Sequence, residues 1–231
     1  MTKFSEELRT IGNDYLDQTL EQDFMQAVIK GKITDEQEVY YINQDGIYLA
    51  GYTENQESIP GFFADLTKAT RRFSALDDTP KYKVLTNEAD VEEDEVRDEF
   101  MQHYRNFSEK DNPKYVQVGK ITKKYLKFLA ENRDQTLLIS LASVQPCAWG
   151  YAALAFKLKA LKKDYVEPWD KWIDFYTNPD FANEGELLFE EIEKVAQQAS
   201  EDERRKACEI FKQGMKLENE FWQQCFDVEG K

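Results

Sequence analysis

Three ionisable residues lie in aromatic-rich stretches of this chain at helical spacing: Asp45, Cys147 and Glu218. A cysteine thiolate can act as a nucleophile, a carboxyl group in an apolar setting can donate a proton near neutral pH, and a second carboxylate can bind a polar ring. Titratable groups on several interior helical faces indicate one polar site if the fold brings those faces together. The candidate chemistry is therefore nucleophilic catalysis assisted by proton transfer.

Asp45 shares a predicted helical face with aromatic residues. Tyr41, Gln44, Asp45 and Tyr48 lie at positions i, i+3, i+4 and i+7. The tyrosines predict that this face is partly buried, where an aspartate costs free energy unless it is paired or hydrogen-bonded. The alternative interpretation is a buried structural acid bonded to a tyrosine or an arginine.

Cys147 directly follows Pro146 in a long apolar segment and shares a face with Tyr151 by i, i+4 spacing. A proline inside a helix removes one amide donor and predicts a kink next to the thiol. The alternative is an inert core cysteine, the usual state of this residue in an apolar helix. Cys208 and Cys225 lack the proline and the neighbouring hydroxyl, and we interpret them as packing residues.

Glu218 lies at i, i+3 and i+4 with Phe221 and Trp222 in the last predicted helix. Desolvation by such aromatics raises the pKa of a carboxyl group, which suits proton donation near neutral pH. The alternative is a partly exposed glutamate at the rim of an aromatic face.

Helices must position these residues, because no strand-like alternation persists along the chain. Ten Gly and six Pro are few for a sheet protein of 231 residues. Thr34 and Gln37 have the spacing of a capping box, so a helix should start there. The predicted helices cover about 4–30, 34–57, 60–76, 88–107, 114–131, 135–163, 168–176, 180–199 and 201–227. We predict one all-α domain spanning residues 1–231, with 135–163 as its central helix.

The composition excludes several classes of protein. A formal charge of −15 without a basic stripe argues against binding to nucleic acid or to anionic membranes. No run approaches the ~18 apolar residues of a membrane span, and the N-terminus has no apolar signal core. Three cysteines form no disulfide framework and fit a reducing compartment, so we expect a cytoplasmic protein.

Four segments together resemble the TenA family, also called thiaminase II: YYINQDGIYLAGY (40–52), VQPCAWGY (144–151), KWIDFYTNPDF (171–181) and LENEFW (217–222). Glu99 and His103 match a further family pattern, and the resemblance extends over roughly 4–226. It implies an all-helical, heme oxygenase-like fold and a homotetramer without cofactor or metal. It also implies hydrolysis of 4-amino-5-aminomethyl-2-methylpyrimidine to the hydroxymethyl pyrimidine and ammonia, with slower cleavage of thiamine, in thiamine salvage.

The resemblance assigns roles to single residues. It implies that Cys147 is the nucleophile, that Glu218 is the catalytic acid and base, and that Asp45 holds the ring nitrogen and amino group of the pyrimidine. The residues that it implies line the ring pocket are Tyr48, Tyr151, Tyr176 and Phe221. Family members often have a tyrosine after the Pro113 region; Tyr115 and Gln117 are the candidates here, and Gln117 is taken as a further substrate contact.

Two rival functions remain open. A non-catalytic regulator or adaptor of the same fold is the first. A heme protein is the second, with His103, the only histidine, as ligand; the Glu99–His103 spacing does not fit a ferritin-like di-iron site. A serine hydrolase is set aside, because it would also have to use His103 and the chain has no Gly-x-Ser-x-Gly elbow.

Overall fold

The structure, a computed structural model, describes residues 3–57 and 117–228. These residues form eight α-helices and no strand, so the predicted all-α class is confirmed. The helices are α1 (Phe4–Glu21), α2 (Asp23–Ile29), α3 (Asp35–Glu57), α6 (Lys120–Arg133), α7 (Leu137–Leu161), α8 (Trp169–Tyr176), α9 (Pro179–Ala196) and α10 (Glu201–Asp227). That residues 1–231 make one domain stays a prediction.

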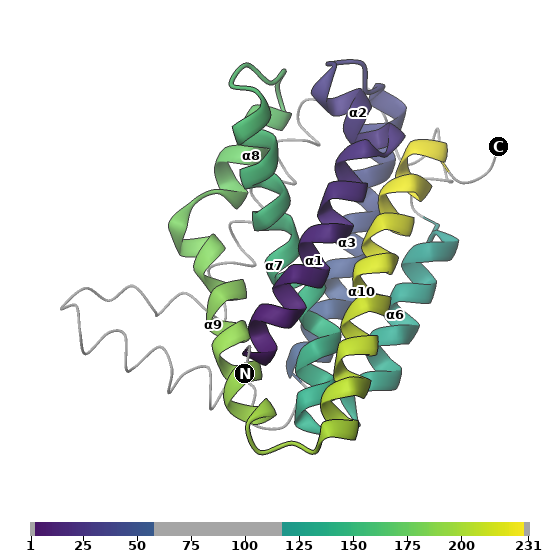
Figure 1. Cartoon of the computed structure of the whole chain (residues 1–231). Helices are drawn as coiled ribbons and strands as arrows, with labels where there is room; N and C mark the ends of the chain where they lie inside the picture. The colour runs from purple at the N-terminus through teal and green to yellow at the C-terminus, as the bar shows by residue number, and fades with distance from the viewer. Residues whose placement is uncertain (1–2, 58–116, 229–231) are drawn as a thin grey trace.

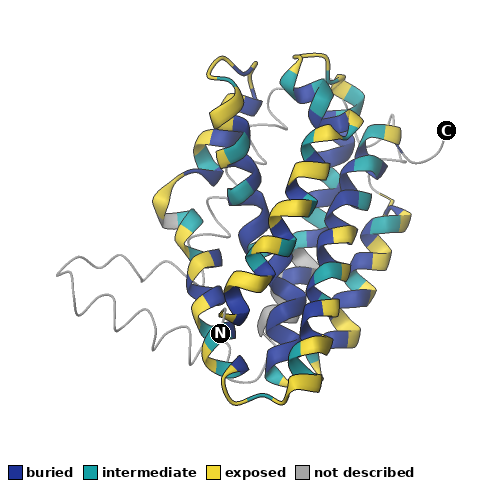
Figure 2. Cartoon of the chain, viewed as in Figure 1, coloured by how far each residue is buried: buried dark blue, intermediate teal, exposed yellow. Residues whose placement is uncertain are grey.

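The long helices α1, α3, α6, α7 and α10 lie side by side, and α8 and α9 lie along one flank of the bundle (Figure 1). α7 is the central element and packs chiefly against α10 and α9. The helices turn their buried faces toward a common interior and their exposed faces outward (Figure 2). Side chains as large as Trp169, Trp172 and Trp222 are almost fully buried there, each contributing roughly 1.5–3 kcal/mol of hydrophobic stabilisation.

From the sequence we expected no segment apolar enough to span a membrane, and α7 departs from that expectation. By length and composition, with a mean hydropathy of 1.4 over its most apolar window, it is long and apolar enough to cross a membrane. However, 83% of that window is buried inside the bundle. A helix that is apolar on all sides is the expected form of a core helix surrounded by other helices.

The first predicted helix, 4–30, is instead two helices. Gln22 has extended backbone angles (φ −69°, ψ 153°) and separates α1 from α2. The Gln26 side-chain amide donates to the Leu20 carbonyl and so satisfies one of the groups freed at the end of α1. The change of direction buries Phe24 against the rings of Tyr41 and Trp222. The prediction was wrong here because this packing across the bundle leaves no local sequence signal.

The start of α3 was predicted correctly. The Gln37 backbone N–H donates to Thr34 Oγ1 (3.3 Å), and the Thr34 N–H donates to Gln37 Oε1 (3.0 Å). These reciprocal bonds are those of a capping box.

The predicted helices 60–76 and 88–107 lie outside the described residues. The helix predicted from 114 begins only at Lys120, because residues 117–119 are not helical and Gly119 is its N-cap residue.

Two glycines let neighbouring helices approach α7 closely. A Cβ atom on Gly214 of α10 would lie 2.5 Å from Pro146 Cγ, and one on Gly185 of α9 would lie 2.6 Å from Trp149 Cα. Both distances are too short for a real side chain, so only glycine fits. α7 remains helical through Pro146, as its bounds show, and the proline ring packs directly against α10.

Candidate active site

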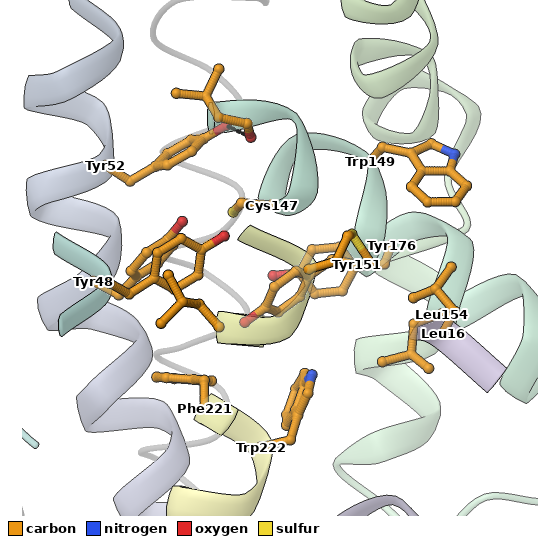
Figure 3. Packing of buried hydrophobic residues seen from close by; sticks show 14 of the residues in the cluster. Leu16, Tyr48, Tyr52, Cys147, Trp149, Tyr151, Leu154, Tyr176, Phe221 and Trp222 are labelled. Atoms are coloured by element: carbon orange, nitrogen blue, oxygen red, sulfur yellow. Dashed lines mark hydrogen bonds between the residues drawn. The ribbon is translucent and has the colours of Figure 1, made fainter. Parts of the chain in front are cut away.

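Cys147 lies in the middle of α7, one residue after the proline that packs on α10. Its side chain is 8% exposed. The Tyr52 hydroxyl donates to the Val144 carbonyl at 3.2 Å, one turn before the cysteine. Figure 3 shows the Cys147 sulfur between Tyr48 on one side and Tyr151 on the other. The thiol therefore faces α3, which carries Tyr48 and Tyr52.

Glu218 lies on α10 and is buried, with 6% exposure. The Tyr125 hydroxyl of α6 donates to its Oε1 atom at 2.8 Å. Burial raises the pKa of Glu218 to about 8; the Tyr125 bond lowers this pKa, and the nearby Asp45 raises it. Glu218 is therefore mostly protonated at neutral pH, with its Oε1 atom accepting from Tyr125. This is the state of a proton donor.

Asp45 lies on α3 with 5% exposure and accepts a hydrogen bond from the Tyr151 hydroxyl of α7 at 3.3 Å. Its charge also raises the pKa of Cys225, which burial raises first. Cys225 is thus nearer to the site than its interpretation as a packing residue suggested, although it is fully buried. The sequence left open that Asp45 is a buried acid bonded to a tyrosine, and this bond is observed. Asp45 nevertheless lies at the same centre as the Cys147 thiol.

Three tyrosines connect the thiol with the carboxyl groups. Burial is the main cause that raises the pKa of Tyr48, Tyr125 and Tyr151 well above the usual range. Cys147 and Glu218 both raise these three pKa values further, so each phenol lies within electrostatic reach of both groups. Four helices, α3, α6, α7 and α10, therefore contribute to one polar centre.

Aromatic rings surround this centre. The Tyr151 and Tyr176 ring centroids are 5.2 Å apart, and those of Tyr48 and Phe221 are 6.3 Å apart. Phe221 and Trp222 lie on the α10 side in Figure 3. Flat rings around polar groups can stack a heterocycle and exclude bulk water.

Seven of the eight predicted site residues are buried and gather at this centre: Asp45, Tyr48, Cys147, Tyr151, Tyr176, Glu218 and Phe221. Gln117 does not join them. It is exposed, and its backbone carbonyl accepts a hydrogen bond from Gln44. The reason is the late start of α6, which leaves Gln117 in the segment before the helix. Tyr115, Glu99 and His103 lie outside the described residues.

Sequence reasoning missed Tyr125 and Tyr52. Tyr125 is 1% exposed and makes the one side-chain bond to Glu218 that the described residues show. It lies three residues after Thr122 and three before Phe128, and all three are buried, so it was on a recognisable inward face. Tyr125 lay within the helix predicted over 114–131, but the tyrosine expected from the family resemblance was sought at Tyr115 or Gln117, near the start of that helix.

The described residues offer protons and a sulfur nucleophile. Within 3–57 and 117–228, no group of three or more His, Cys, Asp or Glu side chains could hold a metal ion. The arrangement sets a proton donor, Glu218, and a sulfur nucleophile, Cys147, among aromatic rings, which are the groups that proton-assisted nucleophilic attack requires.

Comparison with known proteins places this chain in a family. The family profile described as the TENA/THI-4/PQQC family matches residues 82–227. The chain belongs to this family. Among TENA/THI-4/PQQC relatives, the aminopyrimidine aminohydrolase of Bacillus subtilis (strain 168) is 24% identical over 229 residues, 99% of this chain and 92% of that protein. The aminopyrimidine aminohydrolase of Halalkalibacterium halodurans is 31% identical over 93 residues, 40% of this chain and 42% of that protein.

A solved structure of the same family supports the fold. The TenA homologue from Pyrococcus furiosus superposes with a TM-score of 0.73 at 16% identity, covering 96% of this chain and all of the other. At this identity, the likeness shows the fold alone. The heme oxygenase-like character of the fold stays a prediction from the resemblance.

Proposed function

We propose that this chain is an aminopyrimidine aminohydrolase of the thiaminase II type. The proposed substrate is 4-amino-5-aminomethyl-2-methylpyrimidine, hydrolysed to the hydroxymethyl pyrimidine and ammonia, with thiamine as a slower substrate. The observation that carries the proposal is that the buried carboxyl groups of Glu218 and Asp45 and the Cys147 thiol meet among shared tyrosines. The names of the relatives in B. subtilis and H. halodurans support the same reaction class.

In the first half of the proposed reaction, Asp45 accepts from the 4-amino group and fixes the ring between the aromatic walls. Glu218 protonates a ring nitrogen, which makes the ring electrophilic. The Cys147 thiolate forms a bond to the adjacent ring carbon, and the pair of the broken C=N bond stays on the protonated nitrogen. The lone pair of the 4-amino group then expels the aminomethyl nitrogen, which is bound as the ammonium ion and leaves as ammonia, and an exocyclic C=CH₂ bond remains.

In the second half, water adds to the exocyclic methylene and gives one proton to the released ammonia, which leaves as ammonium. The electrons return to the ring, the carbon–sulfur bond breaks and Cys147 leaves as a thiolate. Glu218 recovers the proton from the ring nitrogen as aromaticity is restored. The bound ammonium form of the substrate and one water thus give the hydroxymethyl pyrimidine and one ammonium ion, and the residues return to their starting protonation states. The ring nitrogen proton thus needs one group that acts as both acid and base, which a carboxyl with a pKa of about 8 can do.

The test compares ammonia release from the aminomethyl pyrimidine by the wild type, Cys147→Ser and Glu218→Gln. Each substitution should lower kcat about 100-fold or more, because it removes the nucleophile or the proton donor. Cys208→Ser serves as the control, since Cys208 is buried beside Glu7 on α1 and should leave turnover unchanged. Turnover by Cys147→Ser at the wild-type rate would overturn the mechanism.

A non-catalytic regulator or adaptor is the alternative function that the sequence left open. Ammonia release by the wild-type protein distinguishes the enzyme from a regulator, because a regulator would release none.

The proposal also includes the oligomeric state and the location: we propose a cytoplasmic homotetramer. Light scattering should then give four times the 27.1 kDa mass of the chain.

A further inference from the structure

The N-terminus of α6 has no capping side chain of its own. Its N-cap residue is Gly119, with φ −61° and ψ 156°. The first N–H groups of any helix lack partners within the helix and need them from elsewhere. In α6, two buried glutamines from other helices supply the partners.

Gln44 of α3 is the first of these residues and is fully buried. Its Oε1 atom accepts from the Gly119 N–H and from Thr122 Oγ1, both at 2.8 Å. Its Nε2 atom donates to the Gln117 carbonyl at 2.8 Å. One carboxamide therefore holds the chain on both sides of the helix start.

Gln224 of α10 is the second, with 5% exposure. Its Oε1 atom accepts from the Ile121 N–H at 2.6 Å, and its Nε2 atom donates to Thr122 Oγ1 at 3.0 Å. A Cβ atom on Gly119 would lie 2.6 Å from the Gln224 amide. Gly119 has an ordinary φ angle, so a side chain there would cause no backbone strain but would have to displace the Gln224 amide.

The same two helices carry the acids of the candidate site. Gln44 directly precedes Asp45, and Gln224 lies on the helix of Glu218. Tyr125, whose hydroxyl donates to Glu218, lies one turn after Thr122 on α6. The start of α6 is thus bonded to both neighbours within one turn of the tyrosine.

We propose that Gln44 and Gln224 are positioning residues, whose carboxamides form a shared tertiary cap for α6 and thereby hold the Tyr125 hydroxyl on Glu218. They touch neither substrate nor reacting atoms. Their catalytic role rests on the proposed function, but their effect on Glu218 exists in the protein without substrate. A cap that served folding alone would leave the ionisation of Glu218 unchanged.

The experiment uses Gln224→Met in the full-length chain, because methionine keeps the length of the side chain and removes both hydrogen bonds. The matched control is Gln223→Met, which replaces the neighbouring amide that bonds Asp227 on the surface. The readout is the pKa of Glu218 from its carboxyl carbon resonance in ¹³C-glutamate-labelled protein, assigned with Glu218→Gln. Loss of the Tyr125 bond, which lowers this pKa, should shift it upward by about half a unit or more.

Gly119→Ala disturbs the same contact, between residue 119 and the Gln224 amide, and is the second variant to use if Gln224→Met does not fold. Its new methyl group displaces the Gln224 amide, so the pKa of Glu218 should rise here as well. An unchanged pKa in a folded Gln224→Met or Gly119→Ala protein would overturn the proposal. An equal shift in Gln223→Met would overturn it too, because the effect would then not come from the cap.

Turnover links the cap to the reaction. Gln224→Met should lower kcat about 10-fold with little change in KM, since the binding groups stay in place. In a Tyr125→Phe background the same substitution should have almost no further effect, because its route through Tyr125 is already lost. Additive losses would show that Gln224 does not act through Tyr125. A wild type without ammonia release would refute the proposed function, while the pKa measurement would still decide the cap.

Discussion

At the scale of single residues, the chemistry of the candidate site depends on which carboxyl group carries a proton. Glu218 and Asp45 are both buried, and the charge of Asp45 favours the neutral form of Glu218. The hydroxyl of Tyr151 binds Asp45 and the hydroxyl of Tyr125 binds Glu218. One acid is thus placed to hold a substrate and the other to move a proton, by the same logic that separates paired carboxyl groups in other enzymes.

Removing the Tyr125 hydroxyl should weaken proton transfer without emptying the site. In Tyr125→Phe, Glu218 loses the bond that lowers its pKa, so the alkaline limb of the kcat profile should move to higher pH. We expect kcat to fall about 10-fold at neutral pH, because the carboxyl group of Glu218 is no longer oriented by the Tyr125 hydroxyl. Tyr165→Phe is the matched control, as Tyr165 donates to the Leu158 carbonyl. An unshifted alkaline limb in Tyr125→Phe would contradict the assignment of Glu218 as the acid.

At the scale of elements, the pairing of α7 with α10 sets the position of the thiol relative to Glu218. Pro146 precedes Cys147 directly, and Gly214 lies one turn before Glu218. The proline ring occupies the space that a Cβ on Gly214 would need. Any side chain at 214 must therefore move the two helices apart at the point where both reactive groups project.

Gly214→Ala should destabilise the protein by about 1–3 kcal/mol through overpacking and should also lower turnover. Gly150→Ala on α7 is the control, because a Cβ there meets nothing within 4 Å. It should stabilise the helix by about 0.5–1 kcal/mol, as alanine for glycine does inside a helix. Urea unfolding measures both changes. Equal stability of the two variants would show that the helices are not in tight contact at Pro146.

At the scale of the whole molecule, two buried glutamates make stability depend on pH. Burial raises the pKa of Glu38 to about 7 and that of Glu218 to about 8, from 4.5. Glu38 lies away from the thiol and accepts from the Trp169 indole N–H. The folded state binds more protons than the unfolded state between pH 4.5 and these values, so this stabilisation is complete below 4.5 and is lost as pH rises to 7–8.

Glu218→Gln should therefore be more stable than the wild type above about pH 8, on the order of 5 kcal/mol, and close to it near about pH 4.5. Glu38→Gln should also become more stable than the wild type as pH rises, over the lower pH range that ends near pH 7. Glu193→Gln is the opposite control: burial raises the pKa of Glu193, but the Ser5 N–H bond and its other partners lower it overall. Unfolding free energies measured across this range decide the matter. A constant difference between Glu218→Gln and wild type at all pH values would refute a raised pKa.

The sequence by itself determined most of the helices and the inward faces that carry Asp45, Cys147 and Glu218. The capping box at Thr34 and the spacing of Cys147 and Tyr151 depend on residues within one turn, so pattern alone reveals them. The resemblance to TenA added roles that no spacing can show.

Only the tertiary structure decided how the faces meet. Tyr125 and Glu218 are 93 residues apart, and the cap of α6 joins Gln44 to Gly119 across 75. The break at Gln22, the exposure of Gln117 and the contact of Pro146 with Gly214 likewise follow from packing between distant helices. Local helix propensity does not reveal such contacts, because their free energy arises only after the helices have packed together.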